Sequence, residues 1–427
     1  MLKRFLLTPG PTPVPPEVLA ALGEPVVHHR APRFTEILTE VVAGMKEVFQ
    51  TQNDVLVFAS SGTGAMESAV VNLVAPGEKV IVVNIGNFGE RWVKLAKTWG
   101  ANVVALEYEW GTKADPADVQ KALADNPDAV AVFAQFSETS TGVLNDIKAI
   151  GEIVAATPAV LVVDAISGLG ASDLPTDEWH VDVCVAGSQK ALMVPPGLAY
   201  VAVSEKAWKK VAATDNPRFY FDWTAARKKM TGDAAQTPFT PAVSLLVAQN
   251  AALALIREEG LRNVFERHRV LARACKAGAK AQGLELFGPD DPEANSVTAI
   301  KVPDGVDGGK ITKIARDKYG VWLAGGQGRL KGKIFRFGHC GYFGASDIVV
   351  GLAVMEMVLA QLGYPVKWGA SVAAAERVFM ESTVQLSERD GRQGGLAVRP
   401  AAANDDEGGR RAAGKGEQTW QTVNGYS

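Results

Sequence analysis

Two short runs of mainly β-branched apolar residues, each leading into a polar side chain, constrain the fold of this chain most. The first is Leu161-Val-Val-Asp164, and the second is Val183-Cys-Val-Ala186, which leads through a Gly-Ser-Gln turn to Lys190. Near-continuous apolar runs of this length are typical of parallel strands buried on both faces, which present polar side chains at their carboxyl ends. We therefore expect Asp164 and Lys190 to lie at the same edge of a parallel sheet.

The same alternation of strands and helices extends over most of the chain. Strands are expected at residues 55–58, 80–84, 103–107, 129–133, 160–164, 183–186 and 199–203, with helical patterns between most of them. This pattern predicts an α/β fold whose large domain has a mostly parallel, seven-stranded sheet flanked by helices, with ligands at the carboxyl ends of strands. The predicted organisation is an extended arm (1–16), the large domain (17–243), a linking helix (244–280), a smaller C-terminal α+β domain (281–368) and a disordered tail (369–427).

Composition narrows the classes of function. The formal net charge of −3 argues against a nucleic acid or an anionic membrane as the main partner. The 427 residues include three cysteines without Cys-x-x-Cys spacing and five scattered histidines, so we expect neither disulfides nor a metal site. With no signal peptide and no run of transmembrane length, the sequence predicts a soluble, cytoplasmic protein.

The amine of Lys190 beside a buried Asp164 matches the requirements of pyridoxal 5'-phosphate (PLP). That cofactor needs a lysine for its Schiff base and an anion that keeps its pyridine nitrogen protonated. Each residue also has a structural interpretation, because an aspartate at a strand end is often a helix cap and Ser-Gln-Lys is often a solvated turn.

A glycine-rich turn, Ser61-Gly-Thr-Gly-Ala65, lies between a strand and a helix. Its small residues and the free N–H groups of the helix start could hold a phosphate. The turn is not a P-loop, and it lacks the third glycine of a dinucleotide-binding motif because Glu67 stands there.

Three further residues have both a functional and a structural interpretation. Phe88 could stack on a flat cofactor ring or belong to the core. The polar cluster at 136–142, which includes Ser140, could bind a ring hydroxyl or substrate, or form a capped loop. Arg336, in an apolar strand, could bind a substrate carboxylate or form a structural salt bridge.

With these residues assembled, the sequence resembles the class V, fold-type I PLP aminotransferases, in their alanine/serine–glyoxylate (serine–pyruvate) branch. The resemblance covers residues 3 to 365. It is carried by Thr8-Pro-Gly-Pro-Thr-Pro-Val14, Ser61-Gly-Thr-Gly-Ala65, Glu138-Thr-Ser-Thr-Gly-Val143, Val163-Asp-Ala-Ile-Ser-Gly168, Gly187-Ser-Gln-Lys-Ala-Leu192 with Pro195-Pro-Gly197, and Thr237-Pro-Phe-Thr-Pro241.

The resemblance implies a role for each matching residue. Lys190 would form the Schiff base and Asp164 would pair with the pyridine nitrogen. The other implied cofactor contacts are the phosphate contacts Thr63, Gly64 and Gln189, the adjoining Ala65 where some relatives have histidine, the ring contacts Phe88, Ser140 and Ile166, and Thr240 from a second subunit. Phe88 stands where relatives often have tryptophan. Arg336 would bind the substrate carboxylate, and Pro11 and Thr12 of the arm would restrict substrates to small ones.

The implied function is ping-pong transamination from alanine or serine to glyoxylate or pyruvate by a homodimer. Two alternatives share the fold. PLP-dependent lyases such as cysteine desulfurases carry a histidine immediately before the lysine, where this chain has Gln189, and a reactive cysteine, for which Cys340 is the candidate. A non-catalytic partner subunit of a larger complex is the other alternative. The sequence leaves the preferred donor and acceptor, the pathway, and dimer versus tetramer open.

Overall fold

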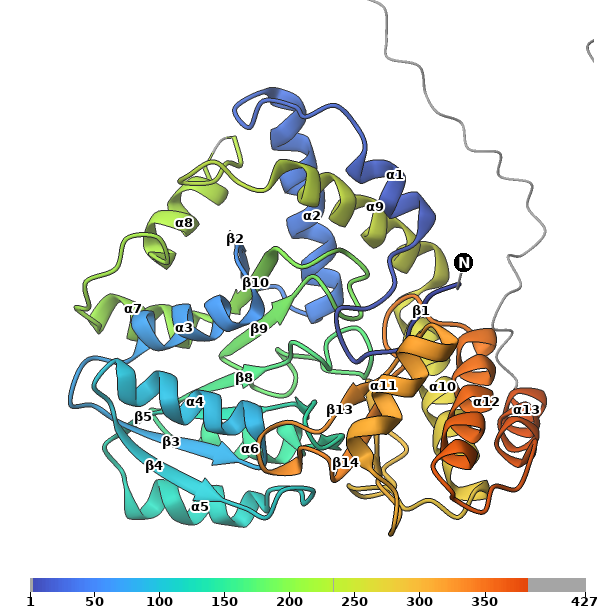
Figure 1. Ribbon diagram of the computed structural model, residues 1–427. Helices are drawn as coiled ribbons and strands as arrows, with labels where there is room; N and C mark the ends of the chain where they lie inside the picture. Colours follow the sequence, from blue (N-terminus) through green and yellow to red (C-terminus); the bar gives the residue numbers. More distant parts are fainter. Residues whose placement is uncertain (1–2, 233, 383–427) are drawn as a thin grey trace, which may run out of the picture. The chain divides into compact units, whose positions relative to one another are not determined.

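The seven expected strands form one sheet in a computed structural model that describes residues 3–232 and 234–382 (Figure 1). The spatial order is β2-β10-β9-β8-β5-β3-β4, and β10 runs antiparallel to both of its neighbours while the other pairs are parallel. The mostly parallel sheet predicted from the sequence is thereby confirmed. The strands are β2 (Asp54–Ala59), β3 (Lys79–Asn84), β4 (Asn102–Glu107), β5 (Ala129–Gln135), β8 (Val160–Asp164), β9 (Val183–Gly187) and β10 (Leu198–Val203).

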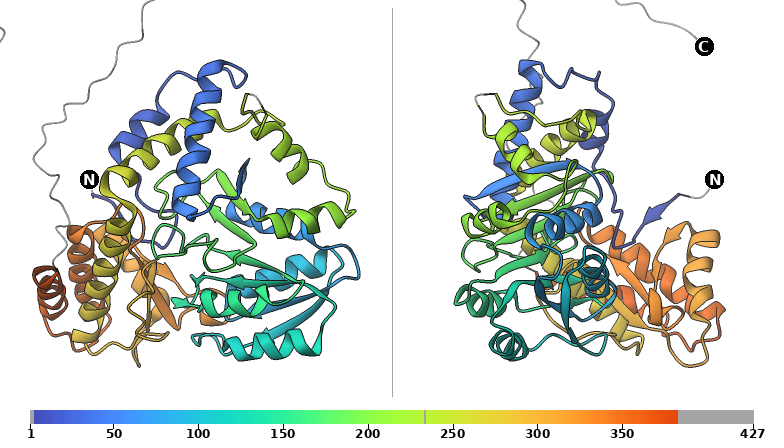
Figure 2. Two further views of the ribbon diagram at one scale, coloured as in Figure 1. Left: turned by 180° about the vertical axis from the view of Figure 1, so that it is seen from behind. Right: turned by 90° about the vertical axis from the view of Figure 1, so that its left-hand side faces the viewer.

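Helices cover both faces of this sheet (Figures 1 and 2). Their apolar stripes and the buried strands form the main hydrophobic core. Several helices begin at a side-chain cap that the sequence supplies: Asp115, Asp146, Ser204 and Asp222 each accept a backbone N–H of the first turn. The helices are α1 (Pro16–Leu22), α2 (Pro32–Phe49), α3 (Gly62–Leu73), α4 (Asn87–Thr98), α5 (Pro116–Asp125), α6 (Ile147–Ala155), α7 (Glu205–Ala213) and α8 (Trp223–Met230).

The C-terminal part of the described chain builds a second core around a three-stranded antiparallel sheet of order β11-β14-β13. The N-terminal arm joins this part, because β1 pairs in parallel with β12. A small hairpin, β6 with β7, follows β5. These elements are β1 (Phe5–Leu6), β6 (Ser137–Glu138), β7 (Val143–Leu144), β11 (Val297–Lys301), α11 (Gly308–Tyr319), β12 (Val321–Trp322), β13 (Ala324–Gly325), η1 (Gly328–Leu330), β14 (Ile334–Gly338) and α12 (Ala345–Gln361).

Two expectations require correction. The single helix expected over 244–280 is two helices, α9 (Val243–Glu259) and α10 (Leu261–Ala281), separated by Gly260, whose φ of 84° cannot continue a helix. The disorder expected from residue 369 is wrong for α13 (Ala370–Glu381), which packs on α10 and α12. A Cβ at Gly278 of α10 would lie 3.0 Å from the Ser371 carbonyl oxygen, so a glycine allows this close approach. The rest of the predicted tail, 383–427, lies outside the described residues.

None of the helices in the described part of the chain combines the length and the apolar character needed to cross a membrane.

Candidate active site

Asp164 and Lys190 come from neighbouring strands, as the sequence predicts. Asp164 is the last residue of β8, and Lys190 follows β9 by three residues; β8 and β9 are parallel neighbours in the sheet. Both side chains are buried. Each influences the other's ionisation, since Asp164 favours a protonated Lys190 and Lys190 favours an ionised Asp164. The sheet therefore brings a buried amine and a buried carboxyl group within electrostatic range of each other.

The N-terminal arm closes over Lys190. Its Nζ donates a hydrogen bond to the Pro9 carbonyl oxygen at 2.6 Å, and the Thr12 hydroxyl donates to the Lys190 carbonyl at 2.9 Å. A Cβ at Gly10 would lie 2.3 Å from the Lys190 Nζ, and Gly10 has a φ of +145°, so only glycine fits this position. Burial lowers the pKa of Lys190, and the nearby charge of Arg336 lowers it further. A larger share of the amine is thus unprotonated than in a lysine exposed to water.

The Asp164 carboxyl ionises less readily than an exposed aspartate does. Burial raises the pKa of this carboxyl to about 7, although its Oδ1 accepts the Ile166 N–H at 2.9 Å. The nearby Glu138 raises it further, while Arg91 opposes the shift. A protonated nitrogen heterocycle beside Asp164 would supply the missing positive charge, which is the chemistry that a pyridinium ring needs from its partner.

The start of α3 has the properties of a phosphate site. Its N-cap residue, Ser61, makes no side-chain cap within the described ranges, and of the first-turn N–H groups that of Gly64 donates to the Ser61 carbonyl at 2.9 Å, which leaves those of Gly62 and Thr63 for an anion. The Arg91 guanidinium donates to the Thr63 hydroxyl at 2.8 Å and so places a positive charge there. Gln189 reaches the same region. A Cβ placed on Gly187 would lie 3.1 Å from the Gln189 Oε1 and 3.5 Å from the Gly62 nitrogen, so both atoms border the same small space.

Arg91 is a functional candidate that the sequence interpretation missed. Besides contacting Thr63, its guanidinium lies over the Phe88 ring, 4.6 Å from the ring centroid. The available signal was its spacing, because residues three apart on a helix share a face, and Phe88 had already been singled out. Phe88 itself is half-buried in the first turn of α4.

Ile166 packs against the first turn of α3, and its contact with the cofactor ring stays a prediction. A Cβ at Gly62 would lie 2.4 Å from its Cδ1, so the glycine makes room for this side chain. Ala65, in contrast, is fully buried in the main core. Its contact with the cofactor stays a prediction.

Arg336 enters the site from β14 of the smaller sheet. Its guanidinium donates to the carbonyl oxygens of Gly325 and Thr139, with Nη1 to Thr139 at 2.8 Å and Nη2 to Gly325 at 2.7 Å. Within the described ranges it forms no salt bridge, so the structural ion pair considered from the sequence is not found there. Burial lowers its pKa to about 10. A buried cation that contacts only neutral acceptors is suited to bind a ligand carboxylate.

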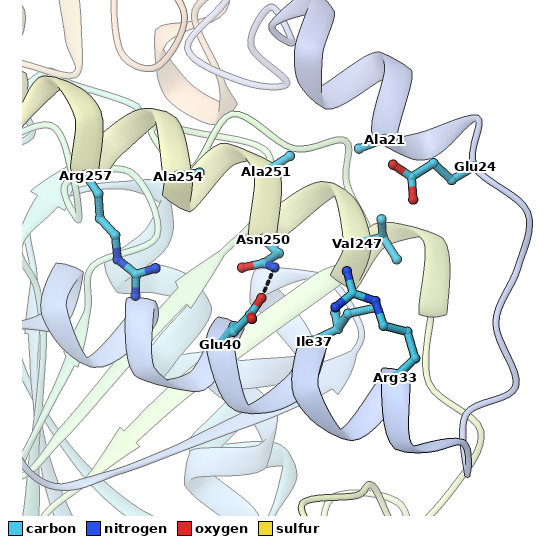
Figure 3. A pocket seen from close by; sticks show the side chains of 10 residues that line it. All are labelled: Ala21, Glu24, Arg33, Ile37, Glu40, Val247, Asn250, Ala251, Ala254 and Arg257. Carbon is cyan, nitrogen blue, oxygen red and sulfur yellow. Dashed lines mark hydrogen bonds between the residues drawn. The ribbon is translucent and has the colours of Figure 1, made fainter. Parts of the chain in front are cut away.

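Two of the predicted residues are exposed. Pro11 is one of them, although it follows Gly10 in the arm that contacts Lys190. Thr240 is also exposed and lines a pocket that includes Ala59 at the end of β2 and Tyr220. No hydrogen bond of Thr240 to Lys190, Gln189 or Thr63 is present in the described part of the chain. A second groove, between α1, α2 and α9, is lined by none of the predicted site residues (Figure 3).

The assembled residues fit PLP. The amine of Lys190, the carboxyl of Asp164 and the uncapped start of α3 beside Arg91 match the aldehyde, the ring nitrogen and the phosphate of that cofactor. Within the described ranges the Oε1 atom of Gln189 is buried without a hydrogen-bond partner, and rotation of this amide would present its NH2 group, a donor, to a phosphate oxygen. In the described ranges no cluster of three or more His, Cys, Asp or Glu could hold a metal ion.

Comparison with known proteins agrees with this chemistry. The family model for class V aminotransferases matches residues 4–331. The chain is 39% identical to an L-aspartate–glyoxylate aminotransferase of Paracoccus denitrificans, over 90% of this chain and 98% of that protein. It is 38% identical to a serine–glyoxylate aminotransferase of Methylorubrum extorquens, over 89% and 97%. The solved ureidoglycine–glyoxylate aminotransferase of Bacillus subtilis superposes with a TM-score of 0.85 at 33% identity, over 89% of this chain and 99% of that one.

The extent of these matches confirms the fold-type I architecture and the PLP dependence predicted from the sequence, and it identifies the protein as an aminotransferase. The chain belongs to the class V aminotransferase family.

Proposed function

We propose that this enzyme transfers the amino group of a small amino acid, alanine or serine, to glyoxylate or pyruvate in a ping-pong reaction. The observation that carries the proposal is the convergence of Lys190, Asp164 and Arg336, which come from three different strands or their ends. Glyoxylate is the favoured acceptor, because the three relatives above are all named for it although their donors differ.

Arg336, Asp164 and Lys190 have different roles in the proposed reaction. Arg336 binds the carboxylate that donor and acceptor share, and its planar guanidinium fixes the orientation of the Cα–H bond. When bound, PLP supplies the carbonyl that takes up the amino group and the ring that withdraws electrons from Cα. Asp164 holds the proton on the ring nitrogen. The Nζ of Lys190 would accept the proton that leaves Cα and, as a protonated amine, would return it when the product forms.

The arm limits the size of the substrate. The Pro9 carbonyl touches the Lys190 Nζ, and Thr12 is hydrogen-bonded to the backbone of the same turn, so little space is left beside the amine. Thr12 thus restricts the site by holding the arm in place, while its hydroxyl is already used in these hydrogen bonds.

We also propose that two copies form the working enzyme and that Thr240 reaches the phosphate of the neighbouring copy. The exposed loop that carries Thr240 adjoins an aromatic cluster of Phe219, Tyr220 and Phe239, in which Phe219 is 80% exposed. Exposed aromatic clusters mark interaction surfaces. Three unpaired cysteines support the cytoplasmic location, where thiols stay reduced.

The lyase alternative finds no support at Cys340. This thiol is fully buried, and burial raises its pKa to about 11. A cysteine nucleophile needs to be accessible and to form the thiolate readily.

The test is an absorbance spectrum of the purified, PLP-loaded protein before and after addition of alanine, serine or aspartate, followed by glyoxylate. Loss of the visible band with alanine or serine, and its return with glyoxylate, is the expected result. A band that no amino acid changes would refute the proposed reaction. Bleaching by aspartate alone would refute the proposed donor while leaving the reaction class intact.

For the dimer, the mass of the wild-type protein in solution is compared with that of Phe219→Ser, and PLP affinity is measured for Thr240→Ala. A monomeric wild type with full activity would contradict the shared site.

A further inference from the structure

Glu138, a residue that no role has been assigned to so far, is the most completely enclosed carboxyl group near the site. It ends β6, its side chain is fully buried, and within the described ranges no lysine or arginine forms a salt bridge with it. A Cβ at Gly86 would lie 2.4 Å from its Cγ, so the backbone before α4 packs directly against it. A buried carboxylate without a counter-ion is costly, which calls for a function or for strong hydrogen bonds.

Four donors converge on this carboxyl group. Its Oε1 accepts the Ser140 N–H at 3.1 Å and the Ser140 hydroxyl at 2.5 Å. Its Oε2 accepts the backbone N–H groups of Phe88 at 3.0 Å and Gly89 at 3.2 Å. These hydrogen bonds oppose the rise in pKa that burial causes at Glu138. This arrangement of two hydrogen-bond donors at each oxygen matches a carboxylate, which accepts at both oxygens. A carboxylic acid fits it less well, because one of its oxygens carries a proton.

The orientation of the Ser140 hydroxyl follows from this arrangement. A hydroxyl has one proton, and that of Ser140 is given to Glu138. The Ser140 oxygen also accepts the Asn87 N–H at 3.0 Å. Toward any further partner, Ser140 therefore offers only a lone pair, so it can accept a hydrogen bond but cannot donate one.

We propose that Glu138 is a positioning residue for the cofactor: it fixes the turn that carries Phe88 and makes the Ser140 hydroxyl an acceptor toward the ring. The proposal rests on the proposed placement of Phe88 and Ser140 at the ring. The β6–β7 hairpin that carries Glu138 also reaches the substrate anchor, because the Thr139 carbonyl accepts a hydrogen bond from Arg336. One carboxylate thus links three parts of the site that come from α4, the β6–β7 hairpin and β14.

The test compares Glu138→Gln with the wild type. The glutamine amide has the same shape as the carboxylate, but one of its two oxygens is replaced by an NH2 group. This donor must face either the N–H and hydroxyl donors of Ser140 or the N–H donors of Phe88 and Gly89, so two donors meet without an acceptor between them. If its nitrogen faces Ser140, the serine proton turns toward the ring. We expect PLP to bind roughly tenfold to a hundredfold more weakly to the apoprotein, as for the loss of hydrogen bonds to a charged group. The absorbance maximum of the bound cofactor should also shift.

Two further variants separate positioning from a general structural effect. Asp146→Asn replaces the exposed N-cap carboxylate of α6 and should leave PLP affinity and absorbance unchanged. Ser140→Ala should alter both. Glu138→Gln made in the Ser140→Ala background should then weaken PLP binding less than it does in the wild type.

The results that overturn the proposal are wild-type PLP affinity and absorbance in Glu138→Gln, or an equal effect of this change with and without the Ser140 hydroxyl. If Glu138→Gln does not fold, Gly86→Ala replaces it, because the added Cβ would press on both Glu138 and Ser140 while keeping the charge. Wild-type PLP binding by folded Gly86→Ala would equally overturn the proposal. A failure of the proposed function is distinguishable, since the wild type itself would then show no bleaching with amino acids.

Discussion

Replacing Asp164 with asparagine should stabilise the apoprotein increasingly as pH rises. The Asp164 carboxyl is buried, and its pKa is about 7 in the folded chain against an ordinary value of 3.8. The folded state therefore binds the proton more tightly than the unfolded state does, and stability falls as pH rises from about 4 to about 7. Asparagine does not titrate, so the variant escapes this loss.

The magnitude follows from the difference between the two pKa values. At about 1.36 kcal/mol for each pH unit, the ionisable carboxyl costs about 4 kcal/mol above pH 7 and about 2 kcal/mol at pH 5. An unpaired amide N–H in the variant costs about 1–3 kcal/mol, but this cost does not depend on pH. Relative to the wild type, the free energy of unfolding of the Asp164→Asn apoprotein should thus rise by about 2–3 kcal/mol from pH 5 to pH 8.

The assay is urea unfolding of both apoproteins, followed by circular dichroism at pH 5, 6.5 and 8. Asp146→Asn is the matched control, because asparagine caps a helix about as well as aspartate and Asp146 is exposed. A constant or shrinking difference between Asp164→Asn and the wild type would refute the view that burial holds this carboxyl uncharged. With PLP bound the order should reverse, since only the aspartate can pair with a protonated ring nitrogen.

Three further substitutions have expected outcomes. Lys190→Ala should lower turnover by roughly 10³-fold or more and remove the visible band of the bound cofactor; retained activity would exclude Lys190 as the base. Arg336→Lys keeps the charge but loses the planar pair of donors, so KM for glyoxylate should rise about tenfold or more in steady-state assays; an unchanged KM would place the carboxylate elsewhere. Gly10→Ala should block formation of the visible band because the new Cβ would overlap the Lys190 Nζ, whereas Gly77→Ala, also at positive φ but with open space around it, should not.

The sheet could be predicted because its strands are continuous apolar runs whose burial on both faces leaves a clear signal. Val160–Asp164 and Val183–Gly187 were expected within one residue of their observed ends. Gly260 was harder to interpret, since a single glycine interrupts a helical pattern only when its backbone takes a positive φ. The helix at 370–381 was missed because its small residues gain stability by packing on α10 rather than from their own apolar periodicity.

For the site, residue type and position at strand ends were sufficient to select Lys190 and Asp164 as candidates, and a cation inside an apolar strand was sufficient to select Arg336. Arg91 and Glu138 were not selected, because a charged residue on a helix or in a hairpin has the same local pattern whether it faces solvent or a buried partner. Only the contacts of Arg91 with Thr63 and of Glu138 with Phe88 and Ser140 distinguish the two cases.

The sequence by itself determined the class of fold and singled out Lys190 and Asp164 as the candidate reactive pair, because strand periodicity and residue chemistry are local properties. The tertiary structure alone decided how that pair is tuned. Burial raises the pKa of Asp164, the arm positions the Pro9 carbonyl at the Lys190 amine, and Glu138 binds a helix some fifty residues earlier in the chain. These effects depend on distances between segments far apart in the sequence, and such distances arise only when the sheet and the helices pack together.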